Sequence, residues 1–198
     1  STSSGGAERV ATNLGGRCVD SPVGESVELT LRQMESAGLA LSPFMQENVQ
    51  ARDRSSRILA AAAAAFGGAF TCNANKSELT VEYCTLYGYE SGFLAALADL
   101  WKHQVYALGH YMNQRIFAAE VIPAEVFSIV PSAELSAEQD VDAGKGDPLI
   151  YPYHDYLFRA FVENWEKMSP AEVLRHYMEH DLEAFIGCGS GVVDRLFP

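Results

Sequence analysis

A long alanine-rich helix is the sequence feature that most constrains the fold of this chain. Ser42 and Pro43 have the form of an N-cap followed by proline at the first helical position. The helix that they open is predicted to run to about Ala65, and its second half is nearly all alanine, the best helix former. Because the side chains on every face of that half are small, other elements can pack closely against several sides. Gly67 and Gly68 are predicted to end the helix.

The segment after this helix has the pattern of a parallel strand that passes into another helix. Residues 69–72 (AFTC) form a short apolar run that is typical of a buried strand, and 73–75 (NAN) form a turn. Residues 76–84 are predicted to be helical. A weaker strand signal lies at 17–23, ahead of a helix at 25–34. The alternation predicts an α/β fold with parallel strands and a high helical content.

The rest of the chain is predicted to be helical apart from one long loop. Apolar residues keep a three- to four-residue spacing from Phe93 to Phe117, which indicates a long amphipathic helix. Residues 132–153 contain prolines, glycines and acidic residues, so we expect a mobile loop there. Residues 1–16 have the character of a tail or a truncation point. Shorter helices are predicted at 7–14, 155–168 and 170–179, the last opened by a capping box.

The acidic character of the chain restricts its partners. Fourteen lysines and arginines against 26 aspartates and glutamates give a formal net charge of −12 at pH 7. Such a chain repels nucleic acids and anionic membranes, so we expect neither as a partner. The longest apolar stretch, residues 58–70, is too short to span a bilayer, and no signal peptide is evident. The cysteines lack metal-binding spacing, which is typical of reduced thiols in a cytoplasmic protein.

Three arginines within six residues form the first candidate binding cluster. Arg52, Arg54 and Arg57 stand out in a chain with so few cations. Guanidinium groups bind phosphates and carboxylates through paired hydrogen bonds. The alternative is a solvated helix face on which Glu47 and Asp53 pair with these arginines, because most surface ion pairs contribute little.

The second cluster lies where the predicted strand at 69–72 passes into a helix. In α/β folds this edge binds ligands, and a helix N-terminus favours anions. Glu78, one turn into the helix, could hold Mg²⁺. The alternative is that Asn73 and Asn75 only form the turn and that Glu78 only complements the helix dipole. Further along, Lys102 could reach a phosphate or could be an ordinary solvated lysine.

The later clusters give weaker signals. Ser132 and the acidic residues after it suit either a metal–phosphate lid or a soluble loop. The sequence has no G-x-S-x-G motif, and no strand precedes residues 187–191 (GCGSG), which argues against a serine hydrolase. His154 and Asp155 could be an acid–base pair, but a helix N-cap explains Asp155 more simply.

Taken in order, these clusters resemble the synthetase domain of glutamine-dependent NAD⁺ synthetases. The matching stretches are SPFMQENVQARDRSSRILAAAAAAFGG, FTCNANKSELTVEYCTLYG, LADLWKHQVYALGHYMN, VPSAEL and DPLIYPYHDYL, within residues 17–198. The resemblance implies a partial adenine-nucleotide α-hydrolase-like (Rossmann-like) fold. It also implies an ATP- and Mg²⁺-dependent ligase, in which ATP adenylates the nicotinate carboxylate of deamido-NAD and ammonia displaces AMP.

The resemblance also implies roles for five residues. Arg52 corresponds to a contact of the deamido-NAD substrate and Glu78 to the magnesium-binding glutamate. Asn73, Lys102 and Ser132 correspond to ATP contacts. No catalytic residue is assigned. A cytoplasmic homo-oligomer with a covalently linked glutaminase domain is further implied.

Two departures from the family pattern limit what is expected of residues 1–198. The family's S-G-G-x-D-S phosphate loop is missing, because residues 4–6 (SGG) are followed by AER and no strand precedes them. Tyr89 stands where many members have aspartate. We therefore expect an internal fragment of the synthetase domain that is inactive on its own. The alternatives are another ATP pyrophosphatase-type synthetase and a non-catalytic binding or assembly module.

Overall fold

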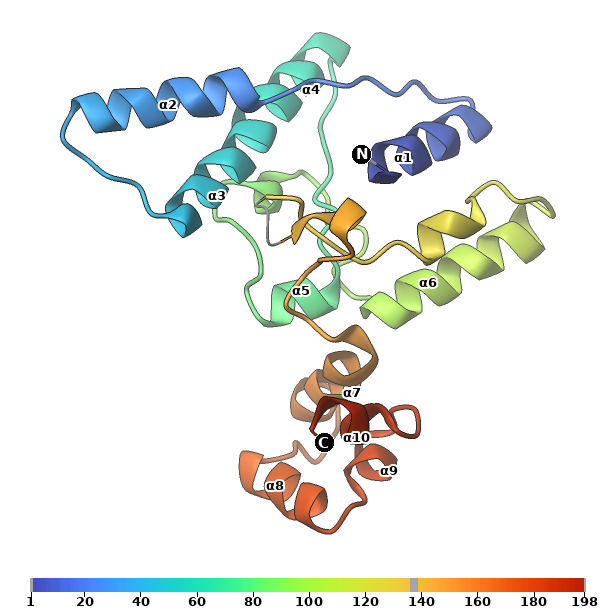
Figure 1. The fold of residues 1–198 in the computed structure, drawn as a ribbon. Helices are drawn as coiled ribbons and strands as arrows, with labels where there is room; N and C mark the ends of the chain where they lie inside the picture. The colour runs from blue at the N-terminus through green and yellow to red at the C-terminus, as the bar shows by residue number, and fades with distance from the viewer. Residues whose placement is uncertain (1, 136–138, 198) are drawn as a thin grey trace.

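The computed structural model describes residues 2–135 and 139–197, and all regular secondary structure in these ranges is helical (Figure 1). The longer helices are α1 (Thr2–Asn13), α2 (Gly24–Ser36), α3 (Pro43–Arg52), α4 (Ala60–Phe66), α6 (Lys102–Tyr111), α7 (Tyr151–Val162) and α8 (Pro170–Met178). The shorter ones are α5 (Lys76–Thr80), α9 (Leu182–Ile186), α10 (Val192–Leu196), η2 (Tyr89–Ser91), η4 (Ala124–Phe127) and η6 (Val141–Ala143). In the described part of the chain, no helix is both long enough and apolar enough to cross a membrane.

The predicted alanine-rich helix is confirmed in length but not in packing. Helix α3, the π-helical segment η1 (Asp53–Leu59) and α4 follow one another without a break. The Ser42 side chain accepts a hydrogen bond from the Met45 amide at 3.3 Å, and Gly67 ends α4 with φ +63°. No residue of α4 is buried, so the close packing expected on several sides is absent from the described structure.

The predicted strands are not formed in the described residues. Residues 17–22 are exposed, so this segment has no buried face to pack against a partner. Residues 69–72 are extended and run parallel to residues 92–95. The Phe93 amide donates to the Phe70 carbonyl at 2.8 Å, and the Cys72 amide donates to the Leu94 carbonyl at 2.9 Å. Two such bonds bring the segments together but do not form a ladder.

The predicted helix at 93–117 begins later than its apolar spacing indicates. Residues 93 and 94 bond to the extended segment 70–72, so they are not available for helical hydrogen bonds. Helix α6 starts after Trp101, whose amide donates to the Gln104 side chain at 2.9 Å, and η3 (Met112–Ile116) continues it. Helix α5 is also shorter than the predicted 76–84.

The first residues that the structure describes, 2–13, form helix α1. Helix α1 starts before the predicted 7–14 and includes Gly5 and Gly6, so this glycine pair is not a phosphate-binding loop. Arg9 forms an ion pair with Glu125, and the Asn13 side chain donates to the Val121 carbonyl at 2.9 Å. These contacts hold α1 beside the segment that contains η4.

The predicted mobile loop at 132–153 is shorter in the structure. Residues 136–138 of this prediction lie outside the described residues. Residues 151–153 belong to α7, because the helix starts four residues before the predicted 155. Between these ranges, η6 is followed by a turn in which the Lys145 amide donates to the Asp140 carbonyl at 2.9 Å. Mobility of the remaining segment stays a prediction.

The main hydrophobic core lies among α7, α8, α9 and α10, which cluster at one end of the chain (Figure 1). Helix α8 starts with the predicted capping box of Ser169 and Glu172. Helices α9 and α10, which complete this core, were not predicted from the sequence. Its buried members are Tyr153, Ala160, Met168, Leu182, Ile186, Val192 and Val193.

The remainder of the molecule is open. The accessible surface is 12570 Å², whereas a compact monomer of 21.6 kDa exposes roughly 9,200 Å². Large apolar side chains account for part of the excess: Phe93 is 85% exposed and Trp165 is 99% exposed. The chain therefore presents apolar surface that a compact protein of this mass would bury.

Candidate functional site

Helix α5 holds the Glu78 carboxylate over its own first turn. The Asn75 side-chain oxygen accepts from the amides of Ser77 and Glu78 at 2.9 and 3.2 Å. In return, the two carboxylate oxygens of Glu78 accept from the amide and the side-chain nitrogen of Asn75 at 3.0 and 2.8 Å. This capping box satisfies amides that the helix leaves unpaired, and it fixes the direction of the Glu78 side chain.

Four side chains from three segments meet at this carboxylate, and we name them the Glu78 cluster: Glu78, Lys102, Asp147 and Tyr151. The Lys102 ammonium lies 3.4 Å from Glu78 Oε1, and both side chains are less than one-fifth exposed. The same ammonium lies 5.1 Å from the centroid of the Tyr151 ring, in a cation–π contact. Lys102 is therefore not the solvated surface lysine that the sequence allowed.

Tyr151 links the two carboxylates of the Glu78 cluster. Its hydroxyl donates to Asp147 Oδ2 at 2.7 Å and lies 3.5 Å from Glu78 Oε1. Burial, followed by the bond to Asp147, raises the pKa of Tyr151 far above its usual value. The phenol therefore stays protonated and acts as a hydrogen-bond donor.

A second set of buried groups lies directly behind this cluster, and we name it the Asp155 network: Ser77, His103 and Asp155. Asp155 is fully buried in the second turn of α7. Its Oδ1 accepts from the Ser77 hydroxyl at 2.5 Å, and its Oδ2 accepts from the His103 amide at 2.9 Å and from His103 Nδ1 at 2.8 Å. The prediction that Asp155 is an N-cap is wrong, because α7 begins four residues earlier.

Ser132 lies in a loop that contacts the Glu78 cluster through Asp147. The Ser132 hydroxyl donates to the Gln139 carbonyl at 2.6 Å and accepts from the Glu134 amide at 3.1 Å. The amide of Ala133, the residue after Ser132, donates to Asp147 Oδ1 at 3.0 Å. Ser132 therefore folds its own loop, and its neighbour connects that loop to the cluster.

Arg54 holds the same loop from the other side. Its guanidinium donates to the carbonyls of Ala133 and Glu134 at 3.0 and 3.1 Å and to the Tyr89 hydroxyl at 2.8 Å. Tyr89, which replaces the aspartate of many family members, is thus a neutral partner of Arg54. The charge of Arg54 is held by neutral oxygen atoms beside the site.

The other two residues with implied roles lie apart from the Glu78 cluster. Arg52 is exposed, and its Nε donates to the Leu86 carbonyl at 3.0 Å. Asn73 is exposed, and its Oδ1 accepts from the Thr71 hydroxyl at 2.9 Å. Of the five residues, the structure brings only Glu78 and Lys102 into direct contact in the described part of the chain.

Several polar residues of this region were not predicted as site residues. Asp147 and Tyr151 lie in the stretch DPLIYPYHDYL, and Ser77 lies in the predicted helix at 76–84. Nothing in the local sequence separates them from ordinary polar residues, because the contacts that bring them to the site link segments 25 to 78 positions apart in the chain.

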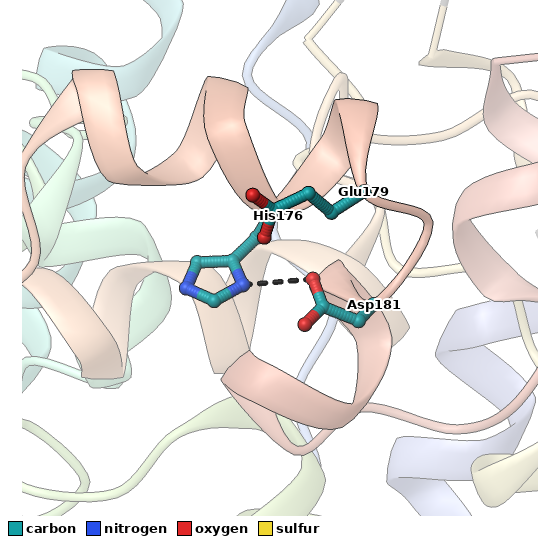
Figure 2. Close-up of side chains that lie close together, drawn as sticks. All are labelled: His176, Glu179 and Asp181. Atoms are coloured by element: carbon teal, nitrogen blue, oxygen red, sulfur yellow. Dashed lines mark hydrogen bonds and ion pairs between the residues drawn. The ribbon is translucent and has the colours of Figure 1, made fainter.

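A separate group of possible metal ligands joins α8 to α9 (Figure 2). His176 Nδ1 lies 2.7 Å from Asp181 Oδ1, and the His176 ring stacks on Phe185. Glu179 is the third member. The Arg175 guanidinium contacts both Glu179 Oε2 at 3.0 Å and His176 Nε2 at 2.9 Å. Because Arg175 already supplies the positive charge, this group is an ion-pair network that holds the helix junction.

Comparison with known proteins gives one consistent family. The NAD synthase family model matches residues 2–184. The glutamine-dependent NAD(+) synthetase of Synechocystis is 36% identical over 179 residues, which cover 87% of this chain and 30% of that protein. The protein of the same name from Thermotoga maritima is 32% identical over 168 residues, which cover 84% of this chain and 28% of that protein.

A solved structure gives the same result. Glutamine-dependent NAD⁺ synthetase from Acinetobacter baumannii, determined in complex with ADP, aligns with a TM-score of 0.58 and 25% identity, covering 92% of this chain and 31% of that one. This chain thus spans about three tenths of the length of these relatives. Since the family model matches nearly the whole chain, the chain belongs to the NAD synthase family.

Proposed function

We propose that this chain is part of an ATP-dependent ligase that converts deamido-NAD to NAD⁺. The observation that carries the proposal is the contact between Glu78 and Lys102 at the starts of α5 and α6. It places a hard oxygen ligand and an ammonium side by side in a partly buried site, which is what a metal–phosphate complex requires. Family membership supplies the reaction, and the named relatives support it.

The reaction has two steps that balance without an outside oxidant or reductant. A carboxylate oxygen of the nicotinate group attacks the α-phosphorus of ATP, and pyrophosphate leaves. Ammonia then attacks the resulting acyl carbon, AMP leaves with the electron pair of the broken C–O bond, and the nitrogen gives up one proton to solvent. In this proposal Lys102 offsets the negative charge that develops on pyrophosphate during the first step.

Substrate contacts are assigned to two partly buried residues, Lys102 and Ser132, and to two exposed residues, Asn73 and Arg52. Asn73, Lys102 and Ser132 bind ATP, and Arg52 binds deamido-NAD. An ADP complex of an A. baumannii relative supports nucleotide binding by this domain. Asn73 and Arg52 have polar atoms at the protein surface, where a ligand can reach them.

The residues present fit a magnesium ion that arrives with the nucleotide. Mg²⁺ in nucleotide enzymes is held by one or two carboxylates together with substrate phosphates and water. Glu78 and Asp147 contact the same Tyr151 hydroxyl, so two carboxylates are available within one small site. They would hold the ion, which supplies charge stabilisation for the phosphates.

The remaining features of the full enzyme belong to the same proposal. We infer a glutaminase domain that releases ammonia from glutamine, a cytoplasmic location and a homo-oligomeric assembly, with no nucleic acid or membrane as partner. The parallel segments 69–72 and 92–95 would belong to the edge of a parallel sheet of the Rossmann-like type. Because residues 2–13 form a helix in place of a phosphate loop, the 198-residue chain alone is expected to be inactive.

The test compares the full-length gene product with the 198-residue chain. Each is incubated with deamido-NAD, Mg²⁺–ATP and ammonium, and NAD⁺ is measured by an enzymatic cycling assay. We expect NAD⁺ from the full-length product and none above a no-enzyme control from the chain. Turnover by the chain alone contradicts the expected inactivity.

Two further arms separate the alternatives. Replacing deamido-NAD with nicotinic acid mononucleotide tests whether the enzyme acts on another carboxylate. If the full-length product turns over neither substrate but binds ADP, the proposed ligase activity is wrong and a binding module is favoured.

A further inference from the structure

The Asp155 network fixes the two backbone positions from which Glu78 and Lys102 extend. Ser77 immediately precedes Glu78, and its hydroxyl donates to Asp155. The same hydroxyl accepts from the amide of Lys102 at 3.0 Å. The next amide along α6, that of His103, donates to the other oxygen of Asp155. One carboxylate from α7 therefore joins the starts of α5 and α6.

The burial of this carboxylate needs an explanation. Removing a charged group from water is unfavourable unless donors replace the lost water. Asp155 and Ser77 are both fully buried, and Asp155 accepts three hydrogen bonds within the network. The first amides of α6 have no hydrogen-bond partners inside the helix. The network supplies those partners: the Ser77 hydroxyl accepts from the Lys102 amide, and Asp155 accepts from the His103 amide.

We propose that Asp155 is the positioning residue of the Glu78–Lys102 pair. It acts on Lys102 more than on Glu78, because Glu78 is also held by its capping box with Asn75, whereas the Lys102 amide is held by Ser77. Asp155 itself does not touch substrate, since it is completely enclosed. This inference rests on the proposed ATP-dependent function and adds the group that sets the geometry of its phosphate-binding lysine.

The central experiment is a double-mutant cycle in the full-length protein. Asp155→Asn keeps the size of the side chain but removes its charge and one acceptor position. ADP affinity in Mg²⁺ is measured by calorimetry for the wild type, Asp155→Asn, Lys102→Ala and the double variant. If Asp155 acts through Lys102, Asp155→Asn lowers the affinity for ADP by about 10-fold in the wild-type background. In the Lys102→Ala background it lowers that affinity by less than about 2-fold.

A matched control separates positioning from loss of stability. Ile186→Val removes one methylene from the α7–α10 core, whose buried members include no residue of the Asp155 network, and is expected to lower the melting temperature without changing ADP affinity. An equal loss of ADP affinity in both backgrounds of the cycle would show that Asp155 is only structural, and the proposal would be overturned. If Asp155→Asn does not fold, Ser77→Ala takes its place in the same cycle, with the same coupling expected.

A spectroscopic measurement on Trp101 tests the positioning role of Asp155 without depending on enzymatic activity. Trp101 is fully buried and precedes Lys102, so its ring reports the start of α6. The protein is labelled with 5-fluorotryptophan, and the Trp101 ¹⁹F resonance is assigned by its loss in Trp101→Phe. Asp155→Asn is expected to shift this resonance, whereas Ile186→Val leaves it in place.

The possible outcomes are distinguishable. If the full-length protein makes no NAD⁺ but the shift and the coupling are found, the proposed reaction is wrong and the positioning role of Asp155 stands. If the Trp101 resonance is unchanged in Asp155→Asn, the proposal is overturned whether or not NAD⁺ is made.

Discussion

Replacing Glu78 by glutamine tests the site most directly. The substitution keeps the shape of the side chain and one acceptor, so the Asn75 amide retains a partner. It removes the negative charge 3.4 Å from the Lys102 ammonium, and it turns the side-chain N–H₂ toward both Lys102 and the Asn75 side chain, which share Glu78 Oε1. Donors then face donors in a site that is less than one-fifth exposed.

The expected loss of stability in Glu78→Gln follows from these contacts. Losing hydrogen bonds to a charged group costs about 1.5–3 kcal/mol, and little of this is screened because the pair is largely buried. For a domain of this length, the melting temperature is expected to fall by roughly 3–12 °C. The catalytic loss is expected to be larger, at least about 100-fold in kcat/KM, as for removal of one preorganised electrostatic group.

The assay is steady-state NAD⁺ formation by the full-length protein, with ATP varied at saturating Mg²⁺, together with a melting curve. Glu82→Gln is the matched control, because Glu82 is exposed one turn further along and the chemical change is the same. The control is expected to change neither quantity. A near-normal rate for Glu78→Gln would refute the reasoning and leave Glu78 as a capping residue only.

Three further predictions concern residues outside the Glu78 cluster. Arg52→Lys keeps the charge but loses the planar fork, so the KM for deamido-NAD is expected to rise about 10-fold while that for ATP stays near wild type; unchanged deamido-NAD kinetics would remove Arg52 from the site. Glu183 accepts from the amides of α10, which lower the pKa of its carboxyl below 4.5. Its stabilisation is therefore present above the unfolded pKa and is lost as the pH falls through the lower folded pKa, so melting curves of Glu183→Gln and wild type should differ at pH 7 and converge in acid. Gly92→Ala places a Cβ against the Thr71–Cys72 backbone and should lower the melting temperature, whereas Gly68→Ala, with open space around it, should not.

Features set by neighbouring residues were predictable from the sequence. The caps at Ser42 and Ser169 and the helix end at Gly67 are confirmed, because each depends on groups only a few positions apart. The Asn75 turn is also confirmed, and the structure adds the capping box that directs the Glu78 side chain. Local chemistry of this kind does not depend on what the rest of the chain does.

Features set by distant partners were not predictable. The apolar spacing of residues 93–101 resembles that of the helix that follows, but bonds to residues 70–72 hold its start in an extended form. Asp155 has the sequence context of an N-cap, yet its partners are Ser77 and His103, which lie 78 and 52 positions away. A pattern within one segment cannot show which buried groups another segment will supply.

Under the proposed function, the arrangement of charges would allow an acidic chain to hold an anionic nucleotide. With a net charge of −12, the long-range field opposes ATP, so binding must come from short-range contacts in a partly buried site. There, Lys102 is balanced by Glu78, and Arg54 is held by neutral oxygen atoms. A phosphate paired with Lys102 would free the Glu78 carboxylate to hold the accompanying Mg²⁺, so neither charge would be left buried without a partner. In the proposed complex, two ion pairs would replace the one of the free protein, and we therefore expect metal and nucleotide to bind together and not separately.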